Sequence, residues 1–292
     1  MANNGKVAFI GLGVMGYPMA GHLKAGGYDV TVYNRTGDKA DAWVAEHKGN
    51  TAATPREAAE GANLVFCCVG NDDDLRAVVL GDDGAFTGMR KGATLIDHTT
   101  TSADVARELG KAGQGQGLCF LDAPVSGGQA GAEGGQLTVM VGGDQAVFDA
   151  ARAAMDCYGK AVTLMGPTGA GQLTKMVNQI CIAGLVQGLA EGMNFAARAG
   201  LDGDLVLDVI SKGAAQSWQM ENRGKTMLKG EFDFGFAVDW MRKDLGICLD
   251  EGDRNGARLP ATALIDQFYK NVQARGGARF DTSSLMLLLT GD

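Results

Sequence analysis

The first candidate for chemistry is a glycine pattern near the N-terminus, G-L-G-V-M-G. It follows the apolar run at 6–10 directly and opens a helix expected over 15–25. In this setting the first glycine permits a tight turn, the second lets a pyrophosphate approach the backbone, and the third lets helix and strand pack closely. A merely tight strand–helix turn is the alternative. With amides of the helix start facing phosphates, the pattern predicts a dinucleotide site formed by Gly11, Leu12, Gly13, Val14, Met15 and Gly16.

The end of the second expected strand, at 29–34, bears on which dinucleotide binds. NAD-selective sites usually place a carboxylate about 20 residues after the motif, where it holds the ribose 2′-hydroxyl. Here Asn34, Arg35 and Thr36 stand in that place, and none of them would repel a 2′-phosphate. Arg35 carries a guanidinium fork that matches phosphate geometry, although an ordinary solvated arginine is the alternative. We therefore expect NADP as the cofactor, with NAD as the second choice.

A second candidate is the segment D-A-P-V-S-G-G at 122–128, which follows an apolar run. The end of an expected strand is where an open α/β sheet presents its ligand crevice. A serine and two adjacent glycines can offer a hydroxyl and backbone N–H groups to a carboxylate. A plain glycine-rich turn is the alternative for these three residues, Ser126, Gly127 and Gly128.

Lys175 is the candidate general acid and base. It lies one turn into a long helix expected over 171–199, and a lone lysine is usually a solvated surface charge. Here a G-x-G turn leads into the helix, and Asn178 and Gln179 follow at i+3 and i+4 on the same face. A lysine whose pKa is tuned by burial and neighbours can donate or accept a proton.

Four blocks of the sequence together resemble the β-hydroxyacid dehydrogenase family. They are GLGVMGYPMAGHL near the N-terminus, DAPVSGGQAGAEGGQLTVMVGG at 122–143, GAGQLTKMVNQ at 169–179 and KDL at 243–245. The blocks occur in the family's order and spacing and cover nearly the whole chain. The family includes 3-hydroxyisobutyrate dehydrogenases, tartronate semialdehyde reductases and glyoxylate/succinic semialdehyde reductases. The resemblance implies NADP-dependent interconversion of a short β-hydroxyacid and its semialdehyde, small carboxylic acids being the substrates.

The resemblance also implies residue roles. Lys175 becomes the proton donor in reduction and the acceptor in oxidation, while residues 126–128 bind the acid group of the substrate. Several members of the family carry asparagine at the position of Gln179. The longer amide of glutamine can still bind a hydroxyl, and the Asn-Gln pair is similar to that of tartronate semialdehyde reductase-like members. The resemblance further implies that Asn178 binds substrate, that Asp244 anchors its helix, and that the cofactor contacts Val69, Thr100 and Lys243. Trp218 and Phe234 would close the pocket, with core packing as the alternative for these two aromatic residues.

Alternation of short apolar runs with helical segments dominates the first 165 residues. Runs that are apolar on both faces are what a parallel sheet between two helix layers requires, so we expect an α/β Rossmann-type doubly wound sheet. After Gly166-Pro167 we expect helices alone. This predicts an NADP-binding domain at 1–165 and an all-α substrate and oligomerisation domain at 166–292. The expected strands are 6–10, 29–34, 63–69, 93–97, 118–124, 136–142 and 161–165, and the expected helices are 15–25, 38–47, 72–79, 102–112, 171–199, 204–212, 217–229, 237–253, 260–274 and 282–289.

Composition argues against several other classes of protein. The chain has 292 residues and a net charge of −8, which disfavours a nucleic-acid or anionic-membrane surface. Its six cysteines form no C-x-x-C pair and read as buried, reduced thiols, and its three scattered histidines suggest no metal site. No signal-peptide pattern is apparent, and the longest apolar stretch is about half of the ~20 residues that a membrane span needs. We therefore expect a cytoplasmic protein without a membrane partner.

Two other functions remain open. Imine reductases resemble this family but usually replace the lysine, so Lys175 counts against imine reduction. A catalytically silent cofactor-binding protein is disfavoured by Lys175 together with residues 126–128. The helix at 171–199 is apolar nearly all round, so we expect it to be buried. It is also too apolar for one neighbouring layer to cover, which predicts a homodimer or homotetramer.

Overall fold

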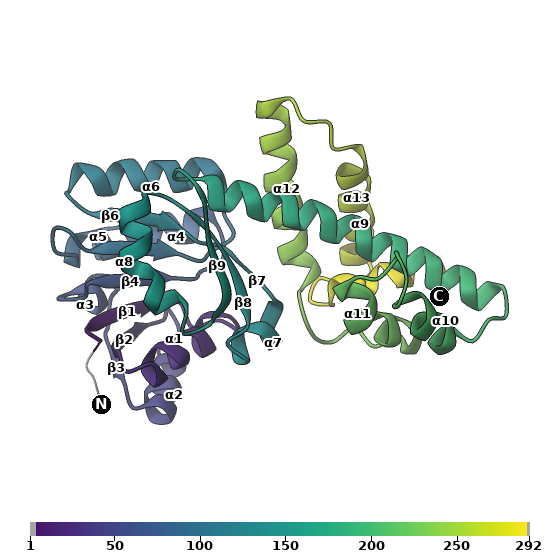
Figure 1. Cartoon of the computed structure of the whole chain (residues 1–292), viewed down its shortest axis with the longest axis horizontal. Coiled ribbons are helices and arrows are strands. Elements are labelled where there is room, and N and C mark those ends of the chain that lie inside the picture. Colours follow the sequence, from purple (N-terminus) through teal and green to yellow (C-terminus); the bar gives the residue numbers. More distant parts are fainter. Residues whose placement is uncertain (1–3, 291–292) are drawn as a thin grey trace. The chain divides into compact units, whose positions relative to one another are not determined.

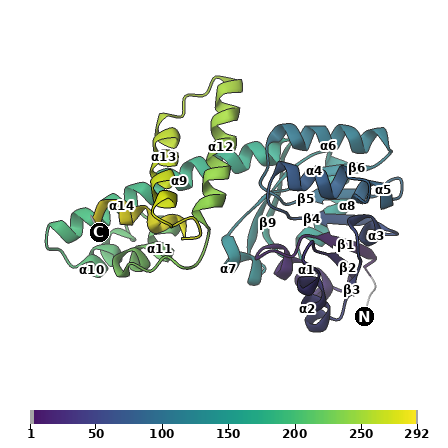
Figure 2. The same cartoon turned by 180° about the vertical axis from the view of Figure 1, so that it is seen from behind.

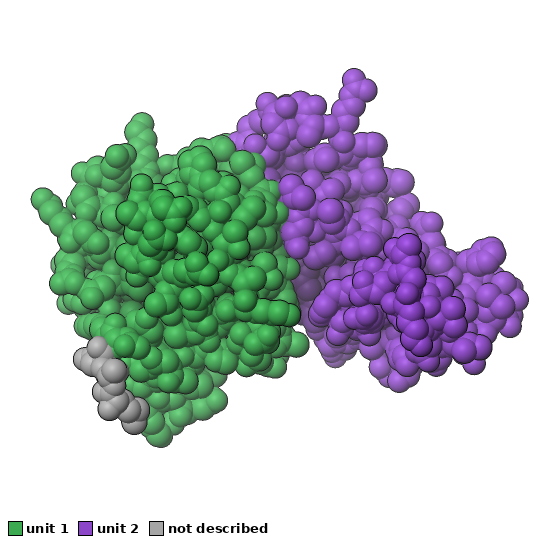
Figure 3. All heavy atoms as spheres, viewed as in Figure 1, with its two compact units in different colours: residues 1–175 green, residues 176–292 purple. Residues whose placement is uncertain are grey.

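The computed structural model describes residues 4–290. The chain divides into two compact units, residues 1–175 and 176–292 (Figure 3). The boundary at 165/166 expected from the sequence falls one residue before the end of the last strand, whereas the first compact unit ends ten residues later, inside helix α9 (Ala170–Arg198). Hydrophobic cores are separate in the two units, with two clusters in the first and one in the second.

Unit 1 is built on a nine-stranded sheet in the order β3-β2-β1-β4-β5-β6-β8-β7, with β9 paired to β8 (Figure 1). From β3 to β6 every neighbouring pair is parallel. The far end is mixed, because β8 runs antiparallel to β6 and β7 and parallel to β9. The doubly wound sheet is thus confirmed. Its strands are β1 (Lys6–Ile10), β2 (Asp29–Tyr33), β3 (Asn50–Thr51), β4 (Leu64–Cys67), β5 (Thr94–Asp97), β6 (Cys119–Asp122), β7 (Val125–Ser126), β8 (Leu137–Gly142) and β9 (Gly159–Gly166).

Alternate residues of the central strands enter two different hydrophobic clusters. In β1, Val7 and Phe9 join the cluster that α1, α2 and α8 cover, whereas Ala8 and Ile10 join the cluster under α3, α4, α5 and α6. This alternation explains why the strands are apolar on both faces. The helices of unit 1 are α1 (Gly16–Ala25), α2 (Gly37–His47), α3 (Pro55–Ala59), α4 (Asp72–Leu80), α5 (Ala85–Gly88), α6 (Ala103–Gly115), α7 (Gly128–Glu133) and α8 (Gln145–Met155).

The strand expected at 118–124 is interrupted. Strand β6 ends at Asp122, Pro124 follows, and β7 begins at Val125 and pairs with β8 on its own. Proline cannot donate to a strand ladder, which accounts for the break. The sequence also missed three helices, α3, α5 and α7, since segments of four to six residues carry almost no helical period.

Unit 2 is helical, as expected from the sequence (Figure 2). Its core combines side chains of α9 with those of the later helices. The segment expected as one helix at 282–289 is instead a 3₁₀ turn followed by a single helical turn. The elements after α9 are α10 (Gly203–Ile210), α11 (Trp218–Lys229), α12 (Val238–Asn255), α13 (Pro260–Ala274), η1 (Thr282–Met286) and α14 (Leu287–Thr290).

Helix α9 is less buried in the single chain than its composition predicts. Side chains at Val177, Leu185 and Phe195 are 61%, 46% and 72% exposed, so the single chain alone does not bury this helix as the sequence led us to expect. Cys181 on the same helix is exposed as well, which contradicts the expectation that the thiols are buried. Among the described helices, α9 is the one that is long and apolar enough to cross a membrane. The core helices of water-soluble proteins share this length and composition.

Candidate functional site

The glycine loop lies between β1 and α1, at the carboxyl end of β1, where the strand order of the sheet reverses. Gly11 has φ +96°, and a Cβ there would come 2.2 Å from the Cys68 carbonyl oxygen. A Cβ at Gly16 would come 2.0 Å from the Gly11 carbonyl oxygen. The protein's own packing therefore requires these two glycines.

Gly13 differs from its neighbours, because a Cβ there would meet no protein atom within 4 Å. This open space fits a phosphate group that must approach the backbone closely. No side chain in the described part of the chain caps the start of α1, and its first turn carries no acidic residue. The first-turn N–H groups can thus bind an anion, and the loop fits the pyrophosphate of a dinucleotide.

Asn34 braces this loop from the end of β2. Its Oδ1 accepts a hydrogen bond from Leu12 N at 2.9 Å, and its Nδ2 donates to Thr36 O at 2.9 Å. Arg35 follows with a side chain that is 85% exposed and pairs with Asp74 at 3.2 Å. Such an exposed pair contributes only about 0–1 kcal/mol, so Arg35 can exchange it for a phosphate. A hollow of about 450 Å³ is lined by Tyr33, Asn34, Arg35, Gly37, Ala40, Asp41, Thr51, Ala52, Ala53 and Glu57.

The ends of β4 and β5 hold the residues expected beside the nicotinamide. Val69 N donates to Thr99 Oγ1 at 3.0 Å, and Thr99 N donates to Asp97 Oδ1 at 3.0 Å. Thr100 follows directly, partly exposed, as is Val69. The bond from Val69 therefore joins the two segments, and the bond to Asp97 fixes Thr99 within its own segment.

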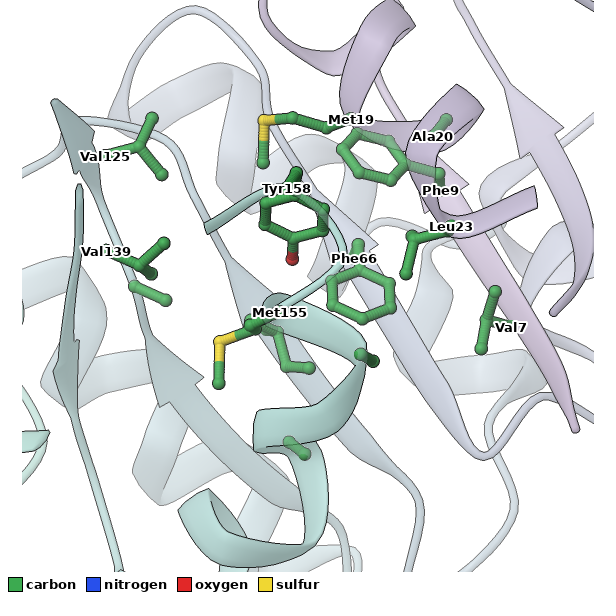
Figure 4. Close-up of a cluster of buried hydrophobic side chains, with 14 of the residues drawn as sticks. Val7, Phe9, Met19, Ala20, Leu23, Phe66, Val125, Val139, Met155 and Tyr158 are labelled. Atoms are coloured by element: carbon green, nitrogen blue, oxygen red, sulfur yellow. The ribbon is translucent and has the colours of Figure 1, made fainter. Parts of the chain in front are cut away.

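A buried histidine and tyrosine support the start of the 122–128 segment. His98 Nδ1 lies 2.6 Å from Ala123 O, and its Nε2 lies 2.8 Å from Tyr158 Oη. A carbonyl can only accept, so Nδ1 carries the proton and Nε2 accepts from the tyrosine hydroxyl. Burial lowers the pKa of His98 to about 4, which keeps the ring neutral. Tyr158 lies beside Phe66 in the hydrophobic cluster (Figure 4).

Beyond Pro124 the chain forms the turn that was expected to bind an acid group. Ser126 ends the short strand β7 and pairs with Thr138 of β8. Gly127 and Gly128 adopt φ of +132° and +62°, values that favour glycine. Consecutive positive φ values turn the chain sharply, and turns of this kind can aim successive main-chain N–H groups at one anion.

Lys175 is 7% exposed, so it is not an ordinary surface lysine. The start of its helix is held by a carboxylate from another element, Asp122 at the end of β6. Asp122 Oδ1 accepts from Gly169 N at 2.7 Å, and Oδ2 accepts from Gln172 N at 2.9 Å. Burial raises the pKa of Asp122, and these N–H donors oppose that rise. The carboxylate therefore caps α9 from outside the helix.

Sequence reasoning assigned no role to three of these residues, Asp122, Gln172 and His98. The first two stand inside motifs that were quoted for other reasons, and His98 follows directly on a buried strand. For Asp122 and His98 the available signal was a polar residue at the carboxyl end of a buried strand, whereas Gln172 lies in the first turn of α9 and gave no such signal.

In unit 2, the residues expected to bind substrate and cofactor form a hydrogen-bonded group. Asn178 Nδ2 donates to Gln179 Oε1, and Gln179 Nε2 donates to Asp244 Oδ2, both at 2.7 Å. Lys243 Nζ lies 3.2 Å from Asp244 Oδ1. Asp244 thus ties α12 to α9, the anchoring role expected of it, and Gln179 is 2% exposed.

Trp218 and Phe234 lie at the surface of unit 2, 48% and 36% exposed, so they are not plain core residues. Both rings flank the Arg223 guanidinium, whose carbon lies 5.0 Å and 4.9 Å from the ring centroids. Arg223 also pairs with the buried Asp281 at 2.9 Å. This stacking orders two exposed aromatic side chains at the surface of unit 2.

Comparisons with known proteins show the family to which this chain belongs. The family model for the NAD binding domain of 6-phosphogluconate dehydrogenase matches residues 6–166, and that for the NAD-binding of NADP-dependent 3-hydroxyisobutyrate dehydrogenase matches residues 169–289. An uncharacterized oxidoreductase of Shewanella frigidimarina is 66% identical over 97% of this chain and 98% of its own length. The 2-hydroxy-3-oxopropionate reductase of Escherichia coli is 34% identical over 97% of each chain.

A solved structure supports the same relationship. The 3-hydroxyisobutyrate dehydrogenase of Mycobacterium tuberculosis superposes with a TM-score of 0.88 at 28% identity, over 97% of this chain and 98% of that one. Both family models together span nearly all described residues. The chain therefore belongs to the β-hydroxyacid dehydrogenase family, and it is an NAD(P)-dependent oxidoreductase of the hydroxyacid dehydrogenase type.

Proposed function

We propose that this chain interconverts a short β-hydroxyacid and its semialdehyde with NADP, using Lys175 as general acid and base. The observation that carries the proposal is the burial of Lys175 on a helix whose start is capped by Asp122. In the same unit, Gly13 leaves open space at a dinucleotide loop. A buried, positioned amine can move a proton at neutral pH.

In the proposed reaction, different residues of the chain transfer the proton and bind the substrate. When bound, the nicotinamide supplies a hydride in reduction and accepts one in oxidation. Lys175 Nζ gives a proton to the oxygen of the aldehyde as that oxygen becomes a hydroxyl, and neutral Lys175 takes the same proton back in oxidation. Ser126 and the N–H groups of Gly127 and Gly128 bind the carboxylate and orient the substrate.

The names of two relatives support the proposed substrate class. One relative is named for 2-hydroxy-3-oxopropionate and another, from Eubacterium barkeri, for 2-(hydroxymethyl)glutarate. These names share a carboxylate close to an aldehyde or a hydroxymethyl group. We expect this chain to act on an acid of the same kind.

A substrate panel tests the proposed function. Purified protein with NADPH is given glyoxylate and the semialdehydes of succinate, tartronate and methylmalonate, and nicotinamide absorbance is followed. β-Hydroxyacids with NADP are tested in the other direction. A cyclic imine is included, because reduction of the imine in preference to every aldehyde would favour the imine reductase alternative. If the protein turned over none of these compounds, the result would contradict the proposal.

Replacing Arg35 by alanine should weaken NADPH binding about tenfold and leave NADH binding unchanged. A charged hydrogen bond contributes ~1.5–3 kcal/mol, and ~1.4 kcal/mol corresponds to a tenfold change in affinity. Titration of nicotinamide fluorescence measures both dissociation constants. Lys39→Ala, a change of a nearby cation on α2, serves as the control for loss of charge. Equal affinity of the unmodified protein for NADPH and NADH would contradict the NADP preference.

We further propose that the chain works as a homodimer or homotetramer that covers the exposed side of α9. The support is the exposure of Val177, Leu185 and Phe195 on that helix. Light scattering at micromolar concentration should give two or four times 30.3 kDa. Phe195→Glu should lower this mass, whereas Leu80→Glu on unit 1 should not. A mass near 30 kDa for the active protein would contradict the proposal.

A further inference from the structure

We propose that Gln172 is a positioning residue, which clamps the segment Thr99–Thr101 to the first turn of α9 and thereby places Lys175. The inference deepens the proposed function and rests on it. Gln172 belongs to the block GAGQLTKMVNQ, of which Lys175, Asn178 and Gln179 already have roles. It is 0% exposed, so its amide cannot exchange its partners for water.

The carboxamide of Gln172 bonds to the main chain on both sides of Thr100. Its Nε2 donates to Thr99 O at 2.7 Å, and its Oε1 accepts from Thr101 N at 3.1 Å. A donor and an acceptor spaced like this imitate the peptide group of a neighbouring strand. Thr100, expected beside the nicotinamide, is therefore held from both sides by one side chain.

The main chain of Gln172 is fixed as well. Its N–H donates to Asp122 Oδ2, while Asp122 Oδ1 accepts from Gly169 N. Lys175 follows three residues later on the same face of α9, about one helical turn along. A shift of Gln172 would therefore carry Lys175 with it.

Thr99 connects the segment held by Gln172 to the ends of β4 and β5. Its hydroxyl accepts from Val69 N and its own N–H donates to Asp97 Oδ1. Gln172 thus links three positions that the reaction must align: Val69, Thr100 and Lys175. A buried amide destabilises a protein unless its groups are paired, and here both groups pair with specific main-chain atoms. An apolar side chain of similar size would fill this space without fixing the segment.

Gln172→Met keeps the volume of the side chain and removes both hydrogen bonds. With the best substrate of the unmodified protein, kcat should fall by up to about 10²-fold, the effect expected when reacting groups shift by about 1 Å. KM and the dissociation constant of NADPH should change less than threefold. Amide hydrogen exchange at Thr101 should speed up, a readout that needs no turnover. Gln145→Met, which removes an exposed bond to Asp149 on α8, is the matched control and should change none of these.

Gln172→Glu separates positioning from stability. The carboxylate still accepts from Thr101 N, but it can donate to Thr99 O only when protonated. Burial raises the pKa of such a carboxyl, so kcat of Gln172→Glu relative to the unmodified protein should rise as pH falls from 8 to 6. This comparison decides the matter if Gln172→Met does not fold.

The outcomes are distinct. An inactive unmodified protein overturns the proposed function before any variant is compared. An active unmodified protein with equal kcat in Gln172→Met, or a flat pH ratio in Gln172→Glu, overturns the positioning role and leaves the proposed function standing. A lower unfolding temperature with unchanged kcat also overturns it, because the residue is then structural only.

Discussion

Replacing Lys175 by alanine should lower kcat by about 10²–10⁴-fold, the usual cost of losing a positioned general acid. The variant should still bind the nicotinamide cofactor, because the glycine loop, Asn34 and Arg35 lie on other elements of unit 1. Steady-state rates with the best substrate and fluorescence titration of NADPH measure the two properties separately. A loss confined to kcat places Lys175 in the proton transfer.

Two further variants distinguish proton transfer from charge. Lys175→Arg keeps a positive charge, but a guanidinium does not give up its proton at neutral pH. It should therefore be about as slow as Lys175→Ala. Lys111→Ala removes an exposed lysine of α6 and should behave like the unmodified protein. Near-normal turnover of Lys175→Ala would show that the lysine is structural and that another group moves the proton.

The architecture of unit 1 could be predicted because its strands are short, apolar on both faces and separated by helical segments. The glycine loop shows what sequence reasoning can and cannot give. The sequence places the loop after β1, and the structure adds the reason for each glycine. The antiparallel strand β7 was not predictable, because two residues carry no period. The break at Pro124 is visible in the sequence only if proline is treated as the end of a ladder.

Long-range polar contacts were beyond sequence reasoning. Gln172 meets Thr99 and Thr101 over about 70 positions of the chain, and Asp122 meets Gly169 over 47. Nothing in local propensity reports such a pairing, since it depends on which strand ends lie next to each other. The exposure of Phe195 was missed for a related reason: composition gives the apolarity of a helix, but only the packing shows which side is covered.

Replacing Gly13 by alanine should lower the affinity for NADPH and NADH by about 10²-fold without destabilising the protein. A Cβ at this position meets no protein atom within 4 Å, and the residue does not have the positive φ that penalises alanine. Alanine at such a site stabilises a fold by about 0.4–1 kcal/mol through the unfolded state. The cost of the substitution falls on binding, because the methyl group would occupy the space that the pyrophosphate needs. Loss of two charged hydrogen bonds, at ~1.5 kcal/mol each, corresponds to about 10²-fold in affinity.

Two other glycines complete the comparison. Gly16→Ala places a methyl 2.0 Å from the Gly11 carbonyl oxygen, so it should lower the unfolding temperature as well as the affinity. Gly115→Ala, on α6, also meets no atom within 4 Å and should change neither property adversely. Thermal unfolding and fluorescence titration of the three variants then separate packing from binding. If Gly13→Ala binds NADPH as tightly as the unmodified protein, the phosphates do not approach the loop, and the open space beside Gly13 has another cause.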